Sequence, residues 1–152
     1  MNVPGDRNTA NSASPTPTET GPSANRSDSI PPITRLPRII GVQAAVCAPL
    51  YSAYNAGLTI PEPSQEGKTL AEGVAISTPY HGKEVLRAVR ESEGIFLTVE
   101  EDQIRAGHKN LAHMGIHTEL TSALVWNALE QLGPEYPDPI VSVITGHGLK
   151  GI

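Results

Sequence analysis

The chain has 152 residues, a formal net charge of −5 and one cysteine, and only 4% of its residues are aromatic. Acidic balance with scattered Lys and Arg argues against nucleic-acid binding, which needs a clustered basic face. One cysteine excludes an internal disulfide, and no apolar run approaches the ~20 residues of a membrane span. A cytoplasmic protein that binds neither nucleic acid nor membrane is therefore the simplest expectation.

The first 32 residues are not expected to contribute to a hydrophobic core. Met1–Pro32 consists mainly of Pro, Ser, Thr, Asn and Gly, with hardly any large apolar side chain. Such a stretch cannot bury enough surface to offset the entropy of ordering. We therefore predict a disordered low-complexity segment at 1–34 and a folded part at 35–152. Its core must be mainly aliphatic, because the chain has one Trp and one Phe.

The folded part begins with a strand and a helix. Arg38–Gln43 is a short apolar run that is typical of a buried strand. Ala44–Gly57 predicts a helix that ends with Gly57 in the C′ position. After a loop, Thr69–Ile76 fits either a strand or an extended segment, interrupted by Gly73.

The rest of the chain alternates helices with strands. Thr78 before Pro79 is a helix-start pattern, and Thr98 with Glu101 fits a capping box in which each side chain satisfies the other residue's backbone N–H. The predicted elements are a helix at Tyr80–Glu91, a strand at Gly94–Val99, a helix at Val99–His113, a helix from Thr118 to the Gly133-Pro134 stop, and a strand at Ile140–Thr145.

This alternation indicates an α/β fold, with a partial three-layer parallel sheet flanked by helices. Three strands make a poor sheet alone, so if further strands normally flank them, exposed edges and either association or marginal stability are expected. Ligands bind at the carboxyl ends of strands in open α/β sheets. Thr145–Lys150 follows the last predicted strand and contains a hydroxyl and two glycines, which makes it the best candidate site.

Four segments carry a recognisable family pattern. They are Pro37-Arg-Ile-Ile-Gly-Val-Gln43, Leu70-Ala-Glu-Gly-Val-Ala-Ile76, Phe96-Leu-Thr-Val-Glu-Glu-Asp-Gln-Ile104, and Thr118-Glu-Leu-Thr-Ser-Ala123 leading to Val143-Ile-Thr-Gly-His-Gly-Leu-Lys150. In order and spacing they resemble the C-terminal part of a fold-type II pyridoxal-phosphate enzyme of the tryptophan synthase β-like superfamily, closest to threonine synthase. The resemblance implies pyridoxal 5′-phosphate as cofactor, an amino-acid substrate, and lyase or transferase chemistry of amino-acid biosynthesis (β/γ-elimination and replacement).

The resemblance also implies roles for five cofactor-binding residues. Thr145 matches the hydroxyl that meets the pyridine nitrogen, and Gly146 and Gly148 let the backbone turn closely beside the ring. Glu119 matches a carboxylate near the same edge, and Gly73 lies in a segment that passes the phenolic oxygen and the substrate side. A neutral hydroxyl need not keep the pyridine nitrogen protonated, which suits elimination and replacement better than transamination.

Two parts of the family's site have no counterpart in this sequence: the Schiff-base lysine and the glycine-rich phosphate loop. Lys109 is expected on a polar helix face and Lys150 in the terminal turn. Neither position favours the buried, desolvated amine that a Schiff base needs, so we assign no catalytic residue. The first hypothesis is therefore a threonine synthase-type enzyme that is incomplete in this chain and needs a complementing N-terminal half or a homo-oligomer. The alternatives are an inactive truncated remnant, a serine or threonine dehydratase-like enzyme, and a small α/β binding module. The Thr-Gly-His-Gly-Leu-Lys stretch favours threonine synthase over the dehydratase.

Other reactive residues predict structural roles. His108, His113 and His117 do not predict a metal site, because Gly115 breaks the helix before the last of them and no carboxylate completes a ligand set. Cys47 is expected to be a small core residue.

Overall fold

The computed structural model describes residues 36–65, 67–136 and 138–151, without the Lys150 side chain. The segment predicted to be disordered at 1–34 lies outside the described residues. In chain order the elements are β1 (Ile40–Ala44), α1 (Pro49–Asn55), the 3₁₀ turn η1 (Glu72–Val74), α2 (Gly82–Glu91), β2 (Ile95–Val99), α3 (Glu101–His113), α4 (Leu120–Glu130) and the 3₁₀ turn η2 (Gly148–Gly151). None of the described helices is long and apolar enough to cross a membrane.

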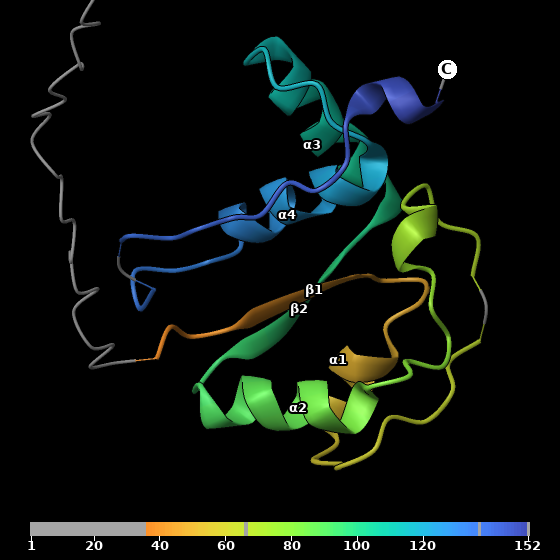
Figure 1. Cartoon of the computed structure of the whole chain (residues 1–152), viewed down its shortest axis with the longest axis vertical. Coiled ribbons are helices and arrows are strands. Elements are labelled where there is room, and N and C mark those ends of the chain that lie inside the picture. Colours follow the sequence, from red (N-terminus) through yellow and green to blue (C-terminus); the bar gives the residue numbers. More distant parts are fainter. Residues whose placement is uncertain (1–35, 66, 137, 152) are drawn as a thin grey trace, which may run out of the picture. The chain divides into compact units, whose positions relative to one another are not determined.

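The sheet consists of β1 and β2, which pair in parallel with a register from Ile40↔Ile95 to Ala44↔Val99. Helices α1 and α2 lie on one side of the two strands, and α4 lies on the other (Figure 1). Because side chains alternate along a strand, Ala44 and Val99 pack into the cluster on the α4 side, whereas Phe96 packs with α1 and α2. The predicted α/β class with parallel pairing and helices on both faces is confirmed.

The core is aliphatic, as predicted. Its largest fully buried side chains include Leu86, Ile104, Leu111, Leu124, Val89 and Val99. Helix α4 buries Ala123, Leu124 and Ala128, which belong to the apolar face predicted from the sequence. Helices α3 and α4 approach closely at Gly107, where a Cβ would lie 3.2 Å from the Ala123 carbonyl oxygen.

The four predicted helices and the strands predicted at Arg38–Gln43 and Gly94–Val99 are present, but they begin later than predicted. Helix α1 begins only at Pro49, and Gly57 follows its C-cap with φ +70°, the left-handed conformation that favours glycine. The predicted Thr98–Glu101 capping box is wrong, because β2 continues to Val99. Instead Gln103 Oε1 accepts the Glu100 N–H at 3.0 Å. Helix α2 likewise starts two residues later than predicted.

The segment Thr69–Ile76 is neither of the predicted alternatives, since it contains the 3₁₀ turn η1. Side chains satisfy its backbone instead of a neighbouring strand. The Leu70 N–H donates to Glu101 Oε2 at 2.7 Å, and the Ala71 N–H donates to Thr69 Oγ1 at 3.1 Å.

The predicted strand at Ile140–Thr145 is wrong. This run passes along α4 without forming a ladder (Figure 1), and the nearest pairing among the described residues is an isolated antiparallel bridge between Thr118 and His147. Its apolar side chains are exposed, with Val141 at 84%. The composition favours a strand, but a strand needs a neighbour, and a cavity separates this run from β1.

Candidate functional site

The N-terminal end of α4 brings together the residues that the sequence singled out. Glu119 is the N-cap of this helix, in an extended conformation with φ −77° and ψ 160°. The Thr145–Gly148 turn comes back to the same end, where His147 bridges to Thr118. Two segments far apart in the sequence therefore form one small polar surface.

Gly146 is fixed to the first turn of α4 through both of its backbone polar groups. Its N–H donates to Ser122 Oγ at 3.0 Å. Its carbonyl oxygen accepts from Thr118 Oγ1 at 2.8 Å and from the Glu119 N–H at 3.2 Å. Gly146, Thr118 and Ser122 are buried, so these bonds are shielded from water and hold the turn rigidly.

Both predicted glycines of the turn lie where a side chain would not fit. A Cβ at Gly146 would coincide with the Glu119 carboxylate, and a Cβ at Gly148 would lie 2.9 Å from the Thr118 carbonyl oxygen. Glycine at these two positions thus permits the close approach of the turn to α4.

The Thr145 hydroxyl is exposed at the edge of this surface, 3.3 Å from Ser122 Oγ. Ser122 Oγ already accepts the Gly146 N–H, so its own hydrogen can be donated to Thr145. In that arrangement Thr145 keeps its hydrogen for another acceptor. The half-buried Glu119 side chain lies beside Gly146, so a neutral donor and a carboxylate border the same turn.

Gly73 reaches the same end of α4 from η1. Its N–H donates to Thr121 Oγ1 at 3.3 Å, and a Cβ there would lie 3.0 Å from the Thr121 side chain. The Leu70 N–H, shortly before η1, donates to the Glu101 carboxylate. All five predicted site residues therefore lie around the first turn of α4, although their roles toward a cofactor stay predictions.

The sequence reasoning gave no role to the hydroxyls that assemble this surface, those of Thr118, Thr121 and Ser122. The available signal was their clustering in the first turn of a predicted helix, where hydroxyls commonly bond to backbone groups. The sequence also gave no indication that His108 would contact the Thr118 backbone. Its Nε2 lies 2.9 Å from the Thr118 carbonyl oxygen, which only accepts, so Nε2 carries the proton.

The lysines and the cysteine have the surroundings predicted for structural residues. Lys68, Lys83 and Lys109 are exposed, and the Lys150 side chain lies outside the described residues. Cys47 is buried, with Sγ 3.5 Å from Ser64 Oγ. Within the described residues no group of three or more His, Cys, Asp or Glu side chains could hold a metal ion.

An α/β unit with a hydroxyl, a carboxylate and close-turning glycines around one helix end is compatible with binding a planar, polar ligand. Residues 24–146 match the family model described as "Pyridoxal-phosphate dependent enzyme", and the chain belongs to this family. Pyridoxal phosphate is the cofactor that family membership implies.

Several curated relatives of this chain are threonine synthases. That of Methanosarcina acetivorans is 32% identical over 122 residues, which are 76% of this chain and 30% of the relative. That of Methanocaldococcus jannaschii is 31% identical over 123 residues, 78% of this chain and 30% of the relative. The Synechocystis enzyme is 33% identical over 119 residues, which are 76% of this chain and 29% of the relative. The chain thus spans about 30% of the length of these relatives.

A solved structure supports the fold. The crystal structure of a T.th. threonine deaminase matches with a TM-score of 0.53 and 23% identity, over 72% of this chain and 38% of that chain. The similarity confirms that the described unit has the fold of part of a fold-type II enzyme.

The described residues fit only one edge of the implied cofactor. The Thr145 hydroxyl, the Glu119 carboxylate and the Gly146 turn provide polar groups for a ring edge. The described lysines are exposed, so none offers the desolvated amine that holds the aldehyde. The carboxylate at the start of α4 also repels a phosphate from that helix end.

Proposed function

We propose that this chain supplies the ring-edge part of the cofactor site of a threonine synthase-type, pyridoxal-phosphate-dependent enzyme. The observation that carries the proposal is the gathering of Thr145, Gly146, Gly148, Glu119 and Gly73 around the first turn of α4. The threonine synthases matched at 31–33% identity support this subgroup. The substrate is an amino acid, and the reaction is elimination followed by replacement.

In this proposal the chain's own residues position the ring and adjust its charge. Thr145 would donate its hydrogen to the ring nitrogen without adding charge, and Ser122 would hold the Thr145 oxygen in place. Glu119 would provide the carboxylate on that side, and the absence of a side chain at Gly146 leaves the space in which this carboxylate lies. The cofactor itself supplies the electron sink for bond cleavage.

We further propose that the 152-residue chain alone does not turn over substrate. The amine that binds the cofactor and the loop that binds its phosphate would come from residues outside these 152. The exposure of the described lysines supports this, because a lysine that binds such a cofactor covalently lies in a pocket shielded from water. An inactive remnant and a complementable half both predict no activity for the chain alone, so only complementation separates them.

The first test is pyridoxal phosphate binding followed by borohydride reduction and peptide mapping, with Lys109→Ala and Lys150→Ala as controls. We expect only slow labelling that is spread over surface lysines. A visible absorption band that reduction fixes to one lysine, and that the matching alanine variant abolishes, would contradict the claim that the chain alone lacks the amine.

The second test adds the part of the Methanosarcina acetivorans threonine synthase that lies N-terminal to the region matched by this chain. We expect threonine formation from O-phosphohomoserine by the mixture, retained by Thr145→Ser and reduced at least tenfold by Thr145→Val. Release of a keto acid from threonine instead would indicate a dehydratase. No cofactor binding by the mixture would refute the proposed role of this chain.

A further inference from the structure

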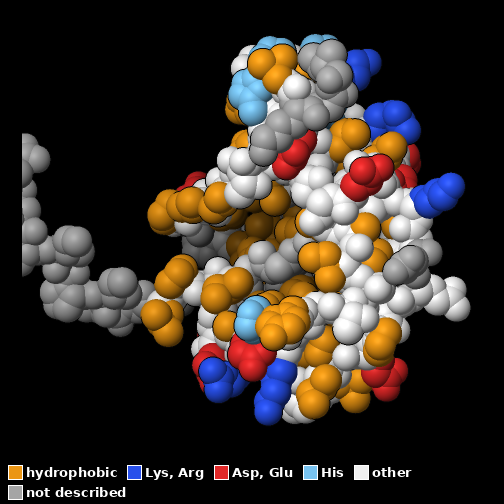
Figure 2. Space-filling view, turned by 45° about the vertical axis from the view of Figure 1, so that its right-hand side comes forward, with side chains coloured by type: hydrophobic (Ala, Val, Ile, Leu, Met, Phe, Trp, Pro, Cys, Tyr) orange, Lys and Arg blue, Asp and Glu red, His pale blue; other side chains and the backbone are white. Residues whose placement is uncertain are grey.

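Histidine side chains gather near the end of the molecule that α3 forms (Figure 2). His113, His117 and His147 are exposed, whereas His108 of α3 is half-buried. Its Nε2 donates to the Thr118 carbonyl oxygen at 2.9 Å. This bond joins α3 to the segment that leads into α4, and the candidate cofactor edge lies at the same place.

Thr118 is the residue through which α3 reaches the Thr145–Gly148 turn. It is 1% exposed, and its Oγ1 donates to the Gly146 carbonyl oxygen at 2.8 Å. Its own carbonyl oxygen precedes α4 and accepts from no backbone N–H among the described residues. A buried carbonyl group without a partner is costly. His108 therefore supplies the bond that keeps this piece of backbone in place.

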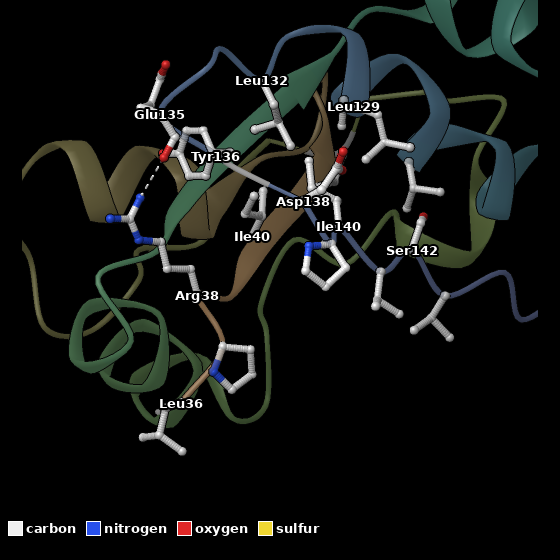
Figure 3. Close-up of a pocket in the computed structure, with 17 residues that line it drawn as sticks. Leu36, Arg38, Ile40, Leu129, Leu132, Glu135, Tyr136, Asp138, Ile140 and Ser142 are labelled. Carbon is white, nitrogen blue, oxygen red and sulfur yellow. Dashed lines mark hydrogen bonds between the residues drawn. The ribbon is translucent and has the colours of Figure 1, made fainter. Parts of the chain in front are cut away.

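The segment before the turn does little to fix it. The run Ile140–Thr145 forms no ladder in the described structure, and its apolar side chains are exposed. It also borders a cavity of about 750 Å³ beside β1 (Figure 3). The position of the Thr145 hydroxyl thus depends on the bonds that hold Gly146, and one of these comes from Thr118.

We propose that His108 is a positioning residue for the cofactor edge, an inference that rests on the proposed function. The His108 Nε2–H fixes the Thr118 backbone, and the Thr118 hydroxyl in turn fixes Gly146, the residue after Thr145. A hydrogen bond weakens steeply when its donor is misaligned. Without His108 the turn can shift, and the bond that Thr145 offers to the ring nitrogen becomes weaker. His108 acts through Thr118 and not by contact with the cofactor.

Amide hydrogen exchange of the chain without cofactor tests this connection independently of the proposed function. We expect the Gly146 amide to exchange about fivefold faster or more in His108→Ala, the effect of about one hydrogen bond. His108→Gln should restore the rate, because the glutamine amide nitrogen donates from about the same reach as imidazole Nε2. The matched control is His113→Ala, at an exposed histidine of the same helix, which should leave the Gly146 rate unchanged.

Two results of these measurements would overturn the proposal. The first is an unchanged Gly146 rate in His108→Ala. The second is an equal increase at the amides of β1, which would mean that only the overall stability had fallen. Nitrogen NMR of the unchanged chain adds a direct check, because neutral His108 must carry its proton on Nε2. A proton on Nδ1 would remove the donor on which the inference depends.

Cofactor binding tests the positioning role itself. The chain is mixed with the part of the Methanosarcina acetivorans threonine synthase that lies N-terminal to the matched region. His108→Ala should weaken the binding of pyridoxal phosphate by about fivefold or more, and His108→Gln should restore it. Equal affinity with the unchanged chain and with His108→Ala would refute the positioning role alone. An unchanged chain that binds no cofactor in the mixture would refute the proposed function, and with it the role of His108 toward the cofactor.

Discussion

Ser122→Ala tests whether the Thr145–Gly148 turn is held by the first turn of α4. The substitution removes the acceptor of the Gly146 N–H, a 3.0 Å bond, and the 3.3 Å contact with Thr145 Oγ1. Ser122 is 4% exposed, so the Gly146 N–H loses its partner where water does not replace it easily. A buried donor without a partner costs about 1–3 kcal/mol, and alanine recovers about 0.5 kcal/mol of helix propensity. The expected net loss is about 0.5–2.5 kcal/mol.

The turn can open without unfolding the whole chain, so the assay must be local. Native-state hydrogen exchange should show the Gly146 amide exchanging about 2-fold to about 70-fold faster, which is the same loss at 1.36 kcal/mol per tenfold. The control is Thr121→Ala, which removes the acceptor of the exposed Gly73 N–H and should leave the Gly146 amide unchanged. Unaltered exchange at Gly146 in Ser122→Ala would refute the claim that α4 fixes this turn.

Three further substitutions test the fold by chemical denaturation. Leu86→Ala should lower the free energy of unfolding by about 2–5 kcal/mol, because Leu86 is fully buried, whereas Arg87→Ala beside it should change it by less than about 0.5 kcal/mol. Gly94→Ala should cost about 1–3 kcal/mol or more, because its Cβ would collide with the carbonyl group of Ile39, and an equal stability would contradict the close approach. Gly57→Ala should cost about 1–2 kcal/mol from its φ of +70° alone, since no atom lies within 4 Å of the added Cβ; Gly57→Asn, which tolerates this conformation better, should cost less.

Elements that depend on local signals could be predicted from the sequence. The apolar runs that became β1 and β2 are short and bounded by turns, and α4 shows its buried face through evenly spaced apolar residues. Gly57 marked the end of α1 because the left-handed conformation is a property of one residue. Helix starts were less accurate. Helix α3 begins at Glu101 and not at the predicted Val99, because Thr98 and Val99 are still paired with β1, and pairing is a property of two strands.

The two segments at which a predicted strand did not form have a shared cause. The Ile140–Thr145 run has the composition of a strand and Thr69–Ile76 allowed one, but neither has a strand beside it in the described structure. Pairing depends on a partner that no local pattern contains. In the second case Glu101, far along the chain, takes the Leu70 N–H that a ladder would have used.

The candidate site was reached through resemblance, and the residues that assemble it were not. Thr145 and Glu119 were chosen because a family motif contains them, and the structure brings both to one helix end. Ser122, which connects them through the Gly146 turn, has no distinctive sequence pattern. A buried serine that bonds to a distant backbone amide can be recognised only when the two segments are seen together.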